Sequence, residues 1–108
     1  MSIESLTQES FAENLNTKFR LPVESGEPLE LELIEVTPGI PLEGTERFSL
    51  VFRGALGFSL PQSIYHLEHE RLGALDIFLV PIARAEDGFR YEAVFNRYVK
   101  KPEGPSSS

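Results

Sequence analysis

Apolar and polar side chains alternate along most of this chain with a period of two residues, the pattern of strands with one buried face. The clearest example is RFSLVFR at 47–53, where apolar side chains on one parity alternate with polar ones. Related patterns, separated by turn-forming residues, predict six strands. These cover residues 18–23, 29–36, 47–53, 64–70, 74–83 and 89–99.

The first segment of the chain has a different period. In SLTQESFAENLNTKF, Phe11 and Leu15 lie four residues apart and most of the residues between them are polar. This spacing predicts a short helix that docks through both side chains, because so short a helix is not stable alone. Thr7 or Ser5 would cap its N-terminus, and Asn16 would end it.

Two of the predicted strands depart from simple alternation. In LELELIEV, at 29–36, the apolar parity changes between Leu33 and Ile34, which predicts a β-bulge or a switch of faces. The segment 74–83 is apolar on both parities and is predicted to be buried on both faces. One of these faces would be covered by the helix at 7–15, or otherwise by another subunit.

The elements together predict a mainly β protein: a small antiparallel six-stranded barrel or sandwich with one short N-terminal helix. The length of 108 residues fits one β-rich domain, at 1–99. The polar sequence KKPEGPSSS has too little apolar content to fold, and we expect residues 100–108 to form a mobile C-terminal tail.

Charge and composition narrow the choice of partner. The formal net charge is −7, from 17 acidic and 10 basic residues. Such a chain repels polyanions, so we expect neither nucleic acid nor an anionic membrane as a partner. With no cysteine, disulfides and thiolate metal sites are excluded. The sequence shows no signal peptide and no transmembrane run, so we expect a protein that is cytoplasmic when made.

The segment Tyr65–Glu70, YHLEHE, holds both histidines of the chain and raises the question of a metal site. In a strand, His66 lies on one face with Glu68 and Glu70, and His69 lies on the other. The two imidazoles then cannot bind one ion without a bulge between them. We therefore predict no metal site, with His66 solvated and His69 half-buried near a turn.

Other chemistry is no better supported. RGALGFSL has glycines, but it lacks the lysine and the following helix of a phosphate-binding loop. No residues pair for general acid–base work, so we predict no catalytic residue, no cofactor and no enzyme activity. Asp76 stands at the start of an apolar run and is expected to pair with an arginine such as Arg90 or Arg97.

An acidic stretch offers a possible docking surface. Residues 24–46 contain seven glutamates and no basic residue. One interpretation is a solvated sheet face, and the other is a docking surface for a basic partner. A polar row on the YHLEHE strand could contribute to it or bind a loosely held divalent ion. The predicted partner surface comprises Glu30, Glu32, Glu35, His66, Glu68 and Glu70.

Five segments of the chain resemble a family of small bacterial proteins that carry only an unknown-function label. They are KFRL, LELELIEV, RFSLVFRG, IYHLEHERLGALDIFLVPI and YEAVFNR, and the resemblance spans roughly residues 10–98. That family is associated with gene neighbourhoods of phage-tail-collar-like fibre proteins. The resemblance implies an accessory role in a tail-like or surface-fibre assembly, with a fibre protein as partner. It implies no activity and no catalytic residue.

Three functional hypotheses follow. The first is a non-enzymatic structural or accessory protein that acts by protein–protein contact and can form a homo-oligomer through an edge strand. The second is a β-barrel that binds a small apolar ligand among its eight phenylalanines and three tyrosines. The third, an enzyme using His66 or His69, has the least support.

Overall fold

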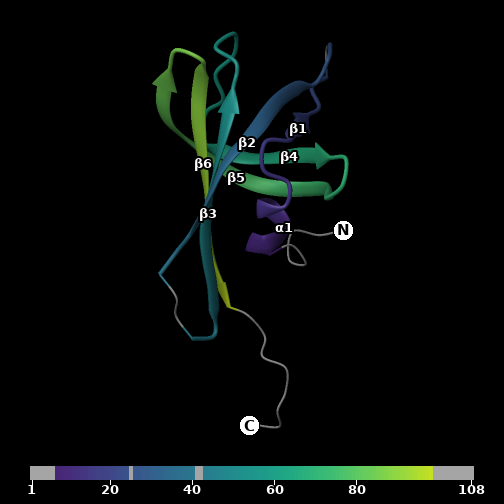
Figure 1. Cartoon of the computed structure of the whole chain (residues 1–108). Coiled ribbons are helices and arrows are strands. Elements are labelled where there is room, and N and C mark those ends of the chain that lie inside the picture. The colour runs from purple at the N-terminus through teal and green to yellow at the C-terminus, as the bar shows by residue number, and fades with distance from the viewer. Residues whose placement is uncertain (1–6, 25, 41–42, 99–108) are drawn as a thin grey trace.

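A single antiparallel sheet of six strands closes on itself in the computed structural model, which describes residues 7–24, 26–40 and 43–98 (Figure 1). The strand order is β1-β2-β3-β6-β5-β4. The elements are α1 (Gln8–Ala12), β1 (Lys18–Leu21), β2 (Leu29–Pro38), β3 (Thr45–Gly54), β4 (Ser63–His69), β5 (Gly73–Ala85) and β6 (Gly88–Tyr98). The predicted mainly β fold with one short helix is confirmed, and its strands belong to one sheet.

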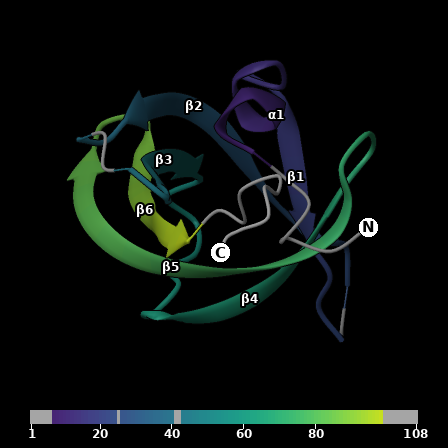
Figure 2. The same cartoon turned by 90° about the horizontal axis from the view of Figure 1, so that it is seen from below.

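The number of paired residues between neighbouring strands differs around the ring. β3 and β6 pair without interruption from Thr45 opposite Tyr98 to Gly54 opposite Phe89. At the other side, β1 meets β4 in register only where Arg20 lies opposite Glu68. Viewed from below, β5 curves across one side of the ring with β4 beside it (Figure 2). The short strand β1 therefore makes the weakest closure.

Alternate side chains of all six strands fill the interior, as the period of two predicts. The largest fully buried side chains come from every strand and from α1: Tyr91, Phe11, Phe19, Phe48, Phe52, Leu31, Leu33, Leu50, Leu67, Ile77 and Leu79. The hydroxyl of Tyr91 is satisfied there, because it accepts a hydrogen bond of 3.1 Å from the backbone N–H of Leu60.

The parity change predicted in β2 is a β-bulge. Leu33 lies opposite Phe52 and Glu35 lies opposite Val51, so Ile34 is the extra residue. A second irregularity, which the sequence pattern did not reveal, falls between Pro81 and Ala83 of β5. Both irregularities lie in the long strands, where the sheet must bend to close.

The helix α1 begins at its predicted cap and docks through one side chain rather than two. Thr7 Oγ1 accepts a hydrogen bond of 3.2 Å from the N–H of Ser10, while Ser5 lies outside the described residues. Phe11 is fully buried, with ring centroids 5.9 Å from Phe48 and 5.7 Å from Phe95. The prediction that Leu15 docks was wrong, because the helix ends at Ala12 and Leu15 stays 40% exposed.

The prediction that Asn16 ends the helix was wrong, because α1 ends at Ala12 and Asn16 instead closes the turn that follows it. Asn16 has a φ of 68°, a left-handed conformation that asparagine tolerates better than most residues. β1 then begins at Lys18 and stops at Leu21, before Pro22 and short of the predicted end. Val23 consequently lies outside the strand, in an exposed position. No helix in the described ranges has the length and apolar character needed to cross a membrane.

The prediction that β5 is buried on both faces was wrong. Leu75, Ile77 and Leu79 point into the ring, but Phe78 on the opposite parity is 48% exposed. In a closed ring each strand has one inward and one outward face, so the outward apolar residues of β5 remain uncovered. α1 does not cover this outward side, because its Phe11 packs on the inward residues of β3 and β6. The predicted tail at 100–108 lies outside the described residues.

Candidate functional site

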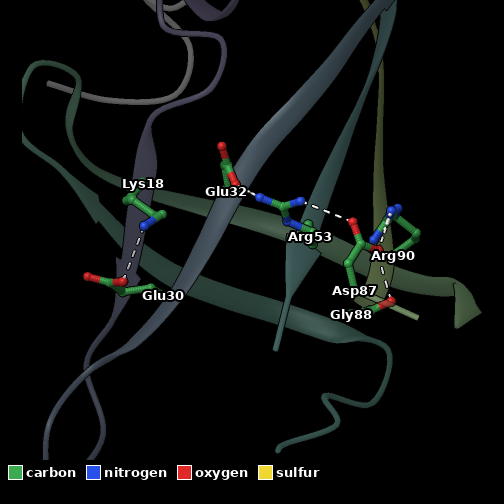
Figure 3. A network of polar contacts seen from close by, with 7 residues as sticks. All are labelled: Lys18, Glu30, Glu32, Arg53, Asp87, Gly88 and Arg90. Atoms are coloured by element: carbon green, nitrogen blue, oxygen red, sulfur yellow. Dashed lines mark hydrogen bonds and ion pairs between the residues drawn. The ribbon is translucent and has the colours of Figure 1, made fainter. Parts of the chain in front are cut away.

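A chain of ion pairs crosses the outer surface where β2, β3 and the β5–β6 turn meet (Figure 3). Arg53 on β3 donates hydrogen bonds to Glu32 on β2 and, over 3.1 Å, to Asp87 in the turn. Arg90 Nη2 in turn donates to Asp87 Oδ1 at 2.9 Å. The strand register explains the arrangement, because Glu32, Arg53 and Arg90 are successive cross-strand neighbours on the outer face.

The ion pairs of this network favour the charged forms of Asp87 and Arg53. Hydrogen bonds from Arg90 and then Arg53 lower the pKa of the Asp87 carboxyl. The same contacts, first with Asp87 and then with Glu32, raise the pKa of Arg53. Asp87 and Arg53 therefore stay ionised at neutral pH, and neither is prepared to exchange a proton with a substrate. The network is a set of surface ion pairs that joins neighbouring strands.

The network lines a groove of about 600 Å³ between the β1–β2 turn and the loop that follows β3. Its wall is mixed, with apolar surface beside charged groups. Lys18 Nζ lies 3.7 Å from Glu30 Oε1, so Lys18 balances part of the negative charge of the groove. The charged residues of the groove are Lys18, Glu27, Glu30, Glu32, Arg53 and Asp87. Such an open groove can hold a polar side chain of another protein, but it presents no paired acid and base.

The glutamates of β2 point outward as predicted, yet they are not a free acidic face. Glu30 is balanced by Lys18 and Glu32 by Arg53. Glu35 lies beyond the bulge and accepts a hydrogen bond of 3.0 Å from the hydroxyl of its near neighbour Thr37. The sequence showed no basic residue in this stretch, and the cations come from other strands.

The β4 part of the predicted partner surface is separated from the β2 part by a basic strand. Arg20 of β1 lies opposite Glu30 on one side and opposite Glu68 on the other. Glu70 follows β4 in the turn. The predicted surface is thus two half-surfaces with positive charge between them, which weakens the idea of one docking site for a basic partner.

His66 is exposed, and its partner is Asp76, which the sequence analysis expected to pair with an arginine. His66 Nδ1 lies 2.9 Å from Asp76 Oδ1, and the two residues are opposite each other in the β4–β5 register. The prediction of an Arg90 partner for Asp76 was wrong, because Arg90 binds Asp87. The side chain of Arg97, the other candidate, lies outside what the structure describes. Asp76 itself points outward into solvent, so it is not a buried charge.

His69 lies on the opposite face from His66, as predicted, and is buried more deeply than expected, at 5% exposure. Its Nδ1 accepts hydrogen bonds of 3.0 and 3.1 Å from the N–H groups of Arg71 and Leu72. Nε2 therefore carries the proton and donates to Thr17 Oγ1 at 2.8 Å. Burial lowers the pKa of His69. Its role is structural: it joins the β4–β5 turn to the segment that follows α1.

The described part of the chain contains no cluster of three or more His, Asp or Glu side chains arranged to hold a metal ion. The two imidazoles point to opposite sides of β4. His66 is flanked by Asp76 and, at 4.0 Å, by Glu68, in an arrangement of surface charges.

One surface feature was missed by sequence reasoning. Four large apolar side chains on β4, β5 and β6 are exposed, and we call them the apolar outer face: Ile64 (66%), Phe78 (48%), Ile82 (49%) and Val94 (68%). Ile64 and Phe78 lie opposite each other in register. The sequence does contain a signal for this exposure, because Phe78 alternates along β5 with the buried Ile77 and Leu79. In the sequence analysis, the parity of Phe78 is interpreted as a second buried face.

The sequence model of a protein family described as a domain of unknown function, DUF6916, matches residues 6–95. The chain belongs to this family. The match spans β1 to β5 and most of β6, and it confirms the resemblance to an uncharacterised family. No curated protein and no solved structure matches the chain. The DUF6916 assignment brings no activity with it, so function must be argued from the surface described above.

Proposed function

We propose that this DUF6916 protein is a non-enzymatic structural or accessory component that acts by protein–protein contact. The supporting observation is the apolar outer face, where Ile64 and Phe78 form an exposed cross-strand pair. Exposed apolar residues are ordinary when scattered, but adjacent ones mark contact surfaces. An exposed phenylalanine at such a place is a typical anchor for a partner, because it carries a large apolar area.

The assembly that this role would serve comes from the family resemblance. Its association with phage-tail-collar-like fibre genes supports a place in a tail-like or surface-fibre assembly, with a fibre protein as the partner. The mixed-charge groove around Arg53 would lie at the side of such a contact and would contribute polar specificity rather than most of the affinity.

The alternative, a binder of small apolar ligands, has less support from the packing. The aromatic side chains that could line a ligand pocket contact one another instead. Phe19 and Phe52 meet edge to face with centroids 5.2 Å apart, and Phe48 and Phe95 stack at 4.7 Å. Rings in mutual contact leave less interior space for a ligand, so we place protein contact first.

Binding to a phage-tail-collar-like fibre protein, the partner that the family resemblance implies, tests the proposal. With both proteins purified, isothermal titration should show binding that Phe78→Ser weakens by about 10-fold or more, as expected of an aromatic anchor. Leu56→Ser is the matched control, because Leu56 is exposed but lies in the loop after β3. Binding that is equally strong in both variants would remove the apolar outer face from the proposal, and no binding would remove the fibre partner.

A further inference from the structure

One edge of β4 has no strand partner over most of its length. β4 pairs with β5 from Ser63 opposite Leu79 to His69 opposite Gly73. On its other edge, β1 reaches β4 only at Glu68. Within residues 7–24, 26–40 and 43–98, Ser63–His66 therefore has register partners in β5 and none in β1. An unpaired edge is a template for a further strand.

We infer that a second copy of this chain docks on this edge, forming a two-fold dimer through antiparallel β4–β4 pairing. The inference rests on the proposed function and names one partner for it. An antiparallel edge is complementary to its own copy, since rotation by a two-fold axis returns the same donors and acceptors. The resulting sheet would run β5-β4-β4-β5 across both copies.

The composition of the edge favours a second copy over an arbitrary partner. The free segment SIYH contains no carboxylate, no lysine and no proline, although the chain as a whole carries a net charge of −7. Lysine and proline are the residues by which edge strands commonly resist pairing. Two copies of an acidic chain can approach here without opposed like charges, because the first carboxylate, Glu68, lies at the position already occupied by β1.

We place the two-fold axis at Tyr65. This register pairs Ile64–His66 of both copies, with Tyr65 opposite itself and Ile64 opposite His66 of the second copy, and it stops before Leu67, beside which β1 runs. Residues 64 and 66 both point outward, so each exposed Ile64 would lie against the imidazole of the second copy. The apolar outer face of each copy would then continue across the dimer axis. An axis at Ile64 would instead place the two Ile64 side chains opposite each other and His66 opposite Gln62 of the second copy.

Charge substitutions at 64 and 66 test both the pairing and its register. Sedimentation equilibrium of the full-length chain over a concentration series should show a monomer–dimer equilibrium. Ile64→Glu with His66→Glu places like charges opposite each other twice and should raise the dimer dissociation constant by about 10-fold or more. Ile64→Glu with His66→Lys places opposite charges there and should restore association. Both positions are exposed, so both variants keep the core intact.

A cysteine cross-link gives an independent measurement. The chain has no cysteine, so any disulfide in a single-cysteine variant must join two copies. Directly opposed antiparallel residues lie about 4.5 to 5.5 Å apart at Cα, within reach of a disulfide. Tyr65→Cys should therefore give a cross-linked dimer on mild oxidation. Val94→Cys, on exposed surface of another strand, should give far less.

Each result separates this inference from the proposed function. A wild-type chain that is monomeric at every concentration overturns the dimer, even if it binds a fibre protein through Phe78. A dimer whose affinity is the same in both charge variants, or that forms no Tyr65→Cys cross-link, overturns β4 pairing. A dimer that obeys both tests but binds no other protein supports the inference and contradicts the fibre role. Addition of a strand from another protein to a monomer also overturns it.

Discussion

At the scale of single residues, the buried His69 makes the stability of this domain dependent on pH. Its neutral ring accepts two backbone N–H groups at Nδ1, and protonation of that nitrogen would break both hydrogen bonds. Burial lowers its pKa below the usual 6.5; of the nearby charges, Arg20 and Arg71 act in the same direction and Glu70 opposes them. The unfolded chain therefore takes up a proton first as the pH falls. The contribution of His69 is complete above about pH 6.5 and is lost as the pH falls through the folded-state pKa.

This gives a prediction for thermal melts followed by circular dichroism between about pH 7 and about pH 5. The melting temperature of the wild type should fall on acidification. In His69→Asn, whose amide oxygen can still accept from the turn but does not titrate, the fall should be smaller. His66→Asn is the control, since it removes the exposed histidine and leaves His69 and its hydrogen bonds in place. Equal slopes for all three proteins would contradict the assignment to His69.

At the scale of elements, the attachment of α1 depends on one aromatic side chain. Phe11 is fully buried against the stacked rings of Phe48 and Phe95, whereas Leu15 is 40% exposed. Phe11→Ala should lower the free energy of unfolding by about 3 to 5 kcal/mol, the usual cost of removing a buried aromatic ring. Leu15→Ala should change it by no more than about 0.5 kcal/mol, as is usual for surface substitutions. Urea denaturation measures both, and similar losses for the two variants would contradict docking through Phe11 alone.

At the scale of the whole molecule, the ring of strands should open first where β1 meets β4. The β3–β6 pair is continuous from Thr45 to Gly54, whereas β1 meets β4 in register only at Arg20 and Glu68. Fewer cooperative hydrogen bonds make a local opening easier. Amide hydrogen exchange followed by NMR should therefore show β1 exchanging well before the central amides of β3 and β6. Slower exchange in β1 than in β3 would show that the ring is closed by contacts stronger than its register indicates.

Several features could be predicted because their causes are local. The alternation of apolar residues identifies the six strands, Thr7 is a cap by its side-chain chemistry, and the doubled apolar parity at Ile34 identifies the bulge. The outward direction of Glu30 and Glu32 follows from the same alternation. In the candidate site, local sequence therefore determined which side chains face solvent on β2 and on which sides of β4 the two histidines lie.

What only the tertiary structure decided are relations between strands distant in sequence. The partners of Arg53 and Asp76, the depth of His69 and the exposure of Phe78 all depend on which strands are neighbours and in which register. Local sequence could not supply these, because alternation specifies the two faces of a strand but not what covers each face. Closure of the sheet gave β5 a single inward face and left its other apolar face in solvent. It also left the first residues of β4 without a partner in β1, because β1 is too short to follow β4 along its length.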